Sequence, residues 1–220
     1  VRMNKLRLLI TNPLLVAKKL FGGVPRFYRL HIIKDEFTVE VKRWFADKGD
    51  ETLRLEYPSL NEDSVVFDLG GYLGDFAYEI NKKYGSKVYL FEPHPEFYEK
   101  CVNRFFDNEN IVPLNFGVAD ENGHFLLSNS NDGSSFTNPN LKGKQGVECQ
   151  LREFFSVLSD LDINHINLMK INIEGDEYPL LQHIADKDEL RIADEYQIQF
   201  HNFIEDAESK RNNIVSAISK

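Results

Sequence analysis

One segment of the chain constrains the fold more than any other. Residues 64–69 form an apolar run typical of a short buried strand, and residues 75–84 carry apolar side chains at helical spacing. Gly70, Gly71 and Gly74 lie in the turn between them. Glycines there allow backbone N–H groups and a helix N-terminus to approach a ligand closely. The segment predicts a strand–turn–helix unit with a binding site at its turn.

The same rhythm continues through the chain. Strands alternating with helices favour a parallel sheet covered on both faces. We expect further strands at residues 87–91, 111–114, 166–173 and 195–200, and helices at 96–106, 151–158, 178–184 and 204–220. Residues 124–127 are expected to form a hairpin with the third strand across the turn at 120–123. Residues 129–146 are predicted to be a long loop that acts as a lid.

Charge divides the chain into two parts. Residues 1–34 hold eight Lys or Arg and no acid, whereas the remainder holds 18 bases and 35 acids. The whole chain has a net charge of −9. An acidic body argues against binding of long nucleic acids. The basic arm, residues 1–34, either binds an acidic membrane surface peripherally or packs as a helix on the domain of residues 35–220. Within that domain, a first helix is expected at residues 35–48.

The cysteines and the apolar segments point to a compartment. Cys101 and Cys149 lie 48 positions apart without neighbouring ligands, so we expect small buried side chains and no disulfide or zinc site. The apolar patches at residues 8–10 and 14–17 are too short to span a membrane. We therefore expect a cytoplasmic protein.

Two carboxylates favour one class of ligand over another. Tyr72 and Asp75 depart from the G-x-G-x-x-G pattern of dinucleotide folds, and Asp68 would repel a diphosphate. Asp68 would instead suit the cationic amino-acid end of S-adenosylmethionine. Glu92 follows the second strand, 18 residues beyond Gly74, where a carboxylate can accept both ribose hydroxyls of an adenosyl or NAD ligand.

Several motifs together resemble one family. The stretch from about residue 60 to 203 is similar to FkbM-type S-adenosylmethionine-dependent methyltransferases. The resemblance is carried by Asp68-x-Gly70-x-x-x-Gly74, Phe91-Glu92-Pro93, Gly133-Ser134-Ser135-Phe136, the run from Met169 to Glu177, and the run from Glu195 to His201.

The resemblance implies a fold and a set of roles. It implies a Rossmann-like, doubly wound, mostly parallel α/β sheet of the class I methyltransferase type. The small-molecule cofactor S-adenosyl-L-methionine would lie across the carboxyl ends of the first strands. Family members are similar in methylating oxygen, often a sugar hydroxyl of a glycan or glycolipid. By this resemblance, Asp68, Gly70 and Gly74 would hold the methionine end of the cofactor, and Glu92 would hold the ribose. Asn115 or Asp120 would border the adenine, with Val118 and Ala119 as its apolar wall. Ser134, Ser135 and Asn172 would contact the substrate or belong to the lid.

The chemistry also requires a base. A neutral alcohol is a poor nucleophile until a base removes its proton. His201 is the first candidate, because its ordinary pKa lies near neutrality and it follows an inner strand. Its alternative role is to close that strand through a backbone hydrogen bond. Glu174 and Glu177 are the next candidates, although Glu177 could simply cap the following helix.

Two departures from the family keep other hypotheses open. Asn172 stands where the family usually has Asp, and Asn is neither a base nor a good ligand for a hard cation, so we expect no metal. The chain also stops where this sheet type normally adds two more strands. The alternative is a degenerate adenosine-binding domain without turnover, while an NAD-dependent oxidoreductase is disfavoured by Tyr72. Lys170, within a strand pattern, is expected either to extend its ammonium to solvent or to pair with an acid, and not to perform catalysis.

Overall fold

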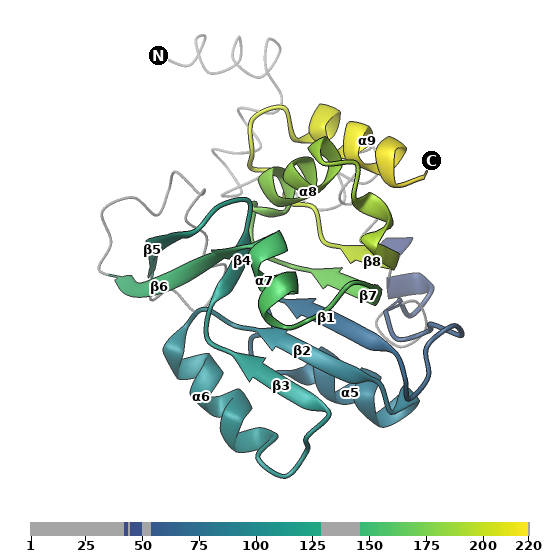
Figure 1. Ribbon diagram of the computed structural model, residues 1–220. Helices are drawn as coiled ribbons and strands as arrows, with labels where there is room; N and C mark the ends of the chain where they lie inside the picture. Colours follow the sequence, from purple (N-terminus) through teal and green to yellow (C-terminus); the bar gives the residue numbers. More distant parts are fainter. Residues whose placement is uncertain (1–41, 44, 50–53, 129–145, 220) are drawn as a thin grey trace, which may run out of the picture. The chain divides into compact units, whose positions relative to one another are not determined.

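A computed structural model describes residues 42–43, 45–49, 54–128 and 146–219 (Figure 1). The chain divides into two compact units, residues 1–56 and 57–220. In the first unit, residues 42–43 and 45–46 are helical and residues 47–49 form a turn, so the helix expected at 35–48 ends at residue 46; its other residues lie outside the described ones. The basic arm at 1–34 and most of the predicted lid, with Ser134 and Ser135, lie outside the described residues. The strands and helices labelled in Figure 1 all belong to the second unit.

Five parallel strands form the central sheet. They are β1 (Val65–Leu69), β2 (Lys87–Phe91), β3 (Ile111–Leu114), β7 (Ile166–Ile171) and β8 (Ala193–Ile198), in the order β3-β2-β1-β7-β8. The chain builds outward from β1 to β3 and then returns to the other side of β1. Ligands of open α/β sheets bind outside the carboxyl ends of the strands at such a reversal. The predicted α/β, Rossmann-like architecture is confirmed.

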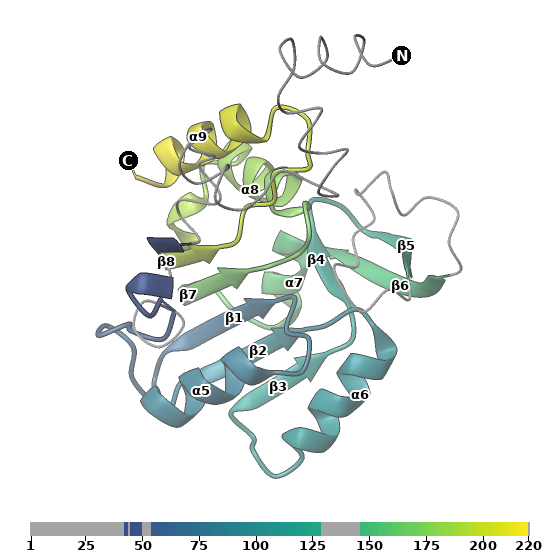
Figure 2. The same ribbon diagram turned by 180° about the vertical axis from the view of Figure 1, so that it is seen from behind.

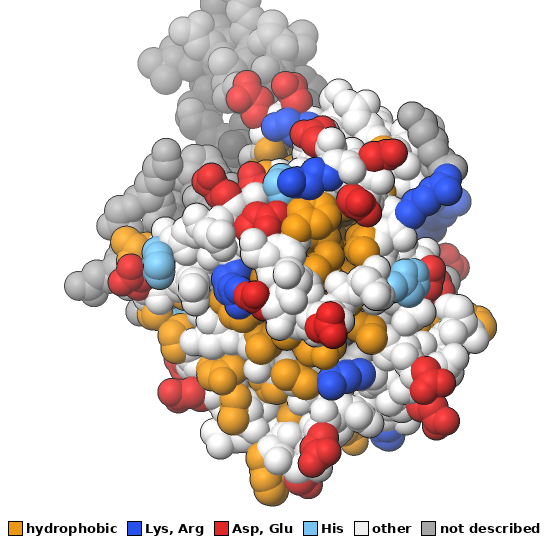
Figure 3. All heavy atoms as spheres, viewed as in Figure 1, with side chains coloured by type: hydrophobic (Ala, Val, Ile, Leu, Met, Phe, Trp, Pro, Cys, Tyr) orange, Lys and Arg blue, Asp and Glu red, His pale blue; other side chains and the backbone are white. Residues whose placement is uncertain are grey.

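Helices cover the two faces unequally. Figures 1 and 2 place α5 (Asp75–Tyr84) and α7 (Phe154–Asp160) on opposite faces, and α6 (Pro95–Arg104) packs along β3. α8 (Glu177–Asp186) and α9 (Ala207–Ile218) pack together beyond β8. Figure 3 shows hydrophobic side chains at the surface over β2 and β3. In the described part of the chain, helices therefore cover both faces in the middle of the sheet, whereas β2 and β3 pack chiefly against α5 and α6.

The core explains why these segments become strands and helices. Every residue of β1 from Val66 to Leu69 is buried, as expected for a strand packed on both faces. Phe67 contacts Phe91 of β2, with ring centroids 5.0 Å apart. Phe76, Ala77 and Ile80 form the buried stripe of α5. Cys101 and Cys149 are buried, as predicted.

A second, three-stranded sheet corrects the predicted hairpin. β5 (Gly123–Ser128) pairs antiparallel with β6 (Gly146–Glu153), not with β3, and β6 pairs on its other side with β4 (Gly117–Ala119). The prediction was wrong because β3 pairs with β2, while the partner of β5 comes 18 or more residues later in the chain.

The helix predicted from residue 151 was also wrong at its start. β6 continues to Glu153, and α7 begins at Phe154. The Glu153 side chain accepts a hydrogen bond of 2.8 Å from the N–H of Ser156, which caps the helix at this point. Polar and apolar residues alternate along Val147–Glu153, which is the pattern of a strand.

The end of the described chain lies after β8. Among the described residues, α9 follows β8, and the two further strands usual for this sheet type are not found.

No helix in the described part of the chain is long and apolar enough to cross a membrane.

Candidate active site at the carboxyl edge of the sheet

The parallel strands bring the predicted residues to one edge of the molecule. Asp68 lies near the end of β1, and Gly70 and Gly74 lie in the turn that follows. Glu92 follows β2 directly, and Asn115 follows β3 directly. Val118 and Ala119 lie buried in β4, and Asp120 follows that strand. Asn172 and Glu174 follow β7, and Glu177 is the first residue of α8. His201 lies three residues after β8.

The glycine turn is built mainly by contacts within the chain. The N–H groups of Gly70 and Gly71 donate to the Phe91 carbonyl at 3.0 and 3.1 Å, and that of Gly74 donates to the Gly71 carbonyl at 2.8 Å. Gly70 has φ of +78°, and a Cβ there would lie 2.0 Å from the Asn172 carbonyl oxygen. The fold itself therefore requires Gly70, and cofactor contacts by Gly70 and Gly74 stay predictions.

A buried ion pair holds the end of β1. Asp68 is fully buried, and its Oδ1 lies 2.7 Å from the Lys170 ammonium of β7, which also donates to the Gly70 carbonyl at 2.9 Å. The pairing expected for Lys170 is confirmed. Asp68 Oδ2 is buried and has no hydrogen-bond partner among the described residues.

Glu92 is held by the backbone on both sides. Its Oε2 accepts the Tyr72 N–H and its Oε1 accepts the His94 N–H, each at 2.8 Å. The side chain is buried, and this burial raises the pKa of Glu92 to about 7, against the lowering effect of the two backbone hydrogen bonds. A carboxyl group that titrates near neutrality therefore lies next to the glycine turn.

His201 is anchored by Glu177. Glu177 is fully buried, and its Oε1 accepts the His201 backbone N–H at 2.8 Å and lies 3.1 Å from His201 Nδ1. The other ring nitrogen, Nε2, lies 3.5 Å from Glu174 Oε2. Burial lowers the pKa of His201, but the hydrogen bond and charge of Glu177 and the charge of Glu174 outweigh it and raise the pKa above its ordinary value.

Glu177 and Glu174 differ in their access to solvent. The second oxygen of Glu177, Oε2, accepts the Gly175 N–H at 2.8 Å, so both of its oxygens bond to the fold or to His201, and the side chain is fully buried. Glu174 is 29% exposed, and its φ of +55° places it in the left-handed region. Glu174 can therefore meet a substrate, whereas Glu177 positions His201.

Sequence reasoning missed Asp176. Its carboxylate is buried, and neither oxygen has a hydrogen-bond partner among the described residues. Burial, with the charges of Glu177 and Asp120, raises the pKa of Asp176 to about 8. The sequence does place Asp176 between Glu174 and Glu177, just after an inner strand, and this position could have identified it as a candidate.

Asp176 predicts an unusual dependence of stability on pH. The folded carboxyl keeps its proton to about pH 8, whereas the ordinary value is 3.8, so the free energy of unfolding should fall as pH rises between these values. Asp176→Asn removes this titration. The unfolding free energy of Asp176→Asn minus that of the parent should therefore increase with pH, by up to about 1.4 kcal/mol per pH unit between pH 5 and 8. Urea denaturation measures both values. A difference that is constant with pH would contradict the prediction.

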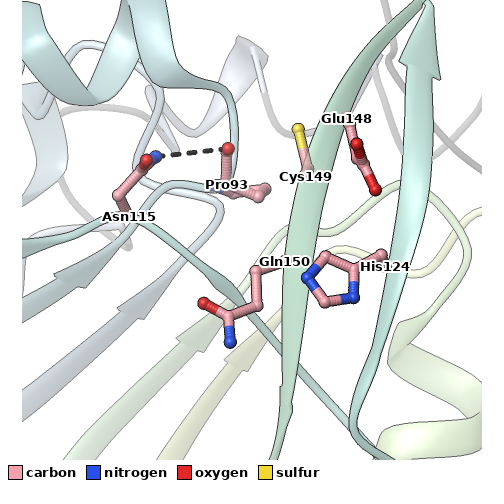
Figure 4. Close-up of a pocket in the computed structure, with 6 residues that line it drawn as sticks. All are labelled: Pro93, Asn115, His124, Glu148, Cys149 and Gln150. Carbon is pink, nitrogen blue, oxygen red and sulfur yellow. Dashed lines mark hydrogen bonds between the residues drawn. The ribbon is translucent and has the colours of Figure 1, made fainter.

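A pocket lies beside the ends of β2 and β3. It has a volume of about 350 Å³ and is lined by Pro93, Asn115, His124, Glu148, Cys149 and Gln150 (Figure 4). Asn115 donates to the carbonyls of Glu92 and Pro93 at 3.0 and 3.2 Å, so it fixes the loop that carries Glu92. The opposite wall comes from β5 and β6. Sequence reasoning missed this wall because it belongs to the second sheet.

A family comparison bears on this edge of the sheet. The model of the methyltransferase FkbM domain matches residues 68–215. The chain belongs to the FkbM methyltransferase family. Its FkbM domain begins at Asp68 and ends within α9, so it includes all the residues of this edge. A comparison with curated proteins found no match.

Membership of the FkbM family agrees with the sheet and its edge. The FkbM domain supports methyltransferase activity, and methyltransferases typically take the methyl group from S-adenosylmethionine. In this FkbM domain the acid after β2, the glycine turn after β1 and the His after β8 lie at one edge of a single sheet.

Proposed function

We propose that this FkbM methyltransferase transfers a methyl group from S-adenosylmethionine to a hydroxyl oxygen of a sugar in a glycan or glycolipid. The observation that carries the proposal is His201, which Glu177 holds at the carboxyl edge that also bears Glu92. The sugar class of acceptor is supported by the family resemblance.

The residues at the edge fit S-adenosylmethionine. Asp68 Oδ2 is a buried acceptor without a partner among the described residues, which suits an ammonium group. Glu92 would accept the ribose hydroxyls. The pocket beside Asn115, with Val118 and Ala119 buried in neighbouring β4, would take the adenine end. When bound, the cofactor supplies a methyl group on a positively charged sulfur.

His201 has the features of a general base. With Nδ1–H donated to Glu177, the Nε2 lone pair is directed away from Glu177 and can accept the hydroxyl proton. The buried Glu177 carboxylate then stabilises the imidazolium that forms. The acceptor would approach beside Glu174, on the side of the sheet edge formed by β7 and β8.

Calorimetric titration and a transfer assay test this proposal together. We expect the chain to bind S-adenosylhomocysteine in preference to NAD or ATP, and to transfer labelled methyl groups from S-adenosylmethionine to sugar acceptors. Preference for NAD would refute the cofactor assignment. Binding of S-adenosylhomocysteine without transfer to any acceptor would favour the degenerate adenosine-binding domain.

The pKa of Glu92 predicts how binding changes with pH. An ionised carboxylate accepts both ribose hydroxyls, so affinity for 5′-methylthioadenosine, which lacks an amino-acid group, should rise with pH up to about 7 and then level. Below that pH we expect at most a roughly tenfold gain per unit, measured by calorimetry. Glu92→Gln should bind more weakly at pH 8 and lose the slope. An unchanged slope in Glu92→Gln would assign it to another group.

A further inference from the structure

The Asp68–Lys170 ion pair has binding capacity that the contacts within the chain do not use. Asp68 is fully buried, and the Lys170 side chain is 12% exposed. The ammonium contacts Asp68 Oδ1 at 2.7 Å, the Gly70 carbonyl at 2.9 Å and the face of Phe76 at 5.8 Å from the ring centre. These contacts hold the charge of Lys170 at the point where β1 enters the glycine turn.

One acceptor and one donor of the pair remain. Asp68 Oδ2 has no hydrogen-bond partner in the described part of the chain. An ammonium has three N–H groups, and its bonds to Asp68 and Gly70 account for two of them. A buried ion pair is stabilising only when its remaining lone pairs and protons are also satisfied. The pair therefore offers one anionic acceptor and one cationic donor to a ligand.

This arrangement is complementary to an amino acid. We propose that Lys170 and Asp68 together recognise the zwitterionic end of the cofactor: Lys170 Nζ donates to the α-carboxylate while Asp68 Oδ2 accepts from the α-ammonium. The inference rests on the proposed function and deepens it, because it makes Lys170 a residue that selects the cofactor. Each charge of the ligand meets the opposite charge of a pair that is neutral as a whole, so ligands without an amino-acid group gain nothing from it.

Three ligands separate this role from a purely structural one. S-adenosylhomocysteine carries both charged groups, its decarboxylated form carries only the amine, and 5′-methylthioadenosine carries neither. Calorimetry on Lys170→Met should show affinity for S-adenosylhomocysteine reduced roughly 10- to 100-fold, the range for a hydrogen bond to a charged group. Affinity for the other two ligands should change less than about threefold. Asp68→Asn should weaken both amine-bearing ligands and leave 5′-methylthioadenosine unaffected.

The double variant Asp68→Asn/Lys170→Met controls for folding. Each single change leaves one charge buried without its partner, whereas the double variant removes both charges. It should unfold cooperatively and bind all three ligands with nearly equal affinity. Equal weakening of all three ligands by Lys170→Met, or no weakening of any, would overturn the inference. Failure of the parent chain to bind S-adenosylhomocysteine at all would instead refute the proposed function.

Discussion

His201→Ala is expected to lower the methyl-transfer rate at saturating substrates by roughly 100- to 10,000-fold, the span of general base catalysis. The reason is the position of the ring. Nδ1 lies 3.1 Å from the buried Glu177 carboxylate, whereas Nε2 has only longer contacts, 3.4 Å to Gln199 Nε2 and 3.5 Å to Glu174 Oε2, and is the nitrogen that would take the proton. His201→Gln keeps a hydrogen-bonding side chain without a base and should be nearly as slow. Affinity for S-adenosylhomocysteine should stay unchanged in both variants.

The pH profile identifies the group that titrates. Because Glu177 and Glu174 outweigh burial and raise the pKa of His201, the parent rate should rise with pH through an ionisation above the ordinary histidine value and then level. Glu177→Gln keeps an acceptor for His201 but removes the charge, so the midpoint of the profile should move to lower pH. A structural role alone for Glu177 would not move the midpoint.

A different result would reassign the base. If Glu174→Gln causes the large loss of rate and His201→Ala only a few-fold loss, the partly exposed carboxylate after β7 removes the proton instead. If neither variant is slow, positioning of an already acidic acceptor carries the catalysis.

Gly70→Ala is expected to lower the free energy of unfolding by about 4 kcal/mol or more, a large part of the roughly 5–15 kcal/mol that stabilises a folded domain. An alanine Cβ would lie 2.0 Å from the backbone oxygen of Asn172, and this backbone cannot move aside as a flexible side chain would. The left-handed backbone at φ +78° adds a further cost of about 1 kcal/mol. Urea denaturation followed by circular dichroism measures the loss.

Gly123→Ala is the matched control. A Cβ at Gly123 would meet nothing within 4 Å, so the same change should alter stability by less than about 0.5 kcal/mol. If Gly70→Ala folds as well as Gly123→Ala and loses only cofactor affinity, the glycine serves the ligand and not the contact with the end of β7.

Local patterns predicted most of the central sheet. The structure has α5, β2 and β3 at residues 75–84, 87–91 and 111–114, with the bounds expected from the sequence. The reason is that a helix with one buried face has apolar residues at helical spacing, and a buried strand has a short apolar run. Polar and apolar residues also alternate along Val147–Glu153, which is β6 up to its last residue. The prediction of a helix from Leu151 did not take this alternation into account. Pairing of β5 with β6 was beyond local reasoning, since a strand carries no local sign of a partner so distant along the chain.

The family resemblance, the alternating α/β order and the candidate site residues near the ends of the strands could be predicted from the sequence alone. Because parallel strands point the same way, Asp68, Glu92 and His201 had to share one edge once that order was known. Which of these groups pair with one another depends on the tertiary structure. Lys170 contacts Asp68 across 102 positions of the chain, and His201 contacts Glu177 across 24. Of the two carboxylates near His201, Glu177 is buried and Glu174 is partly exposed. Hydrogen bonds and burial act at a few ångströms in space, and only the packing of α8 and β7 against their neighbours sets those distances.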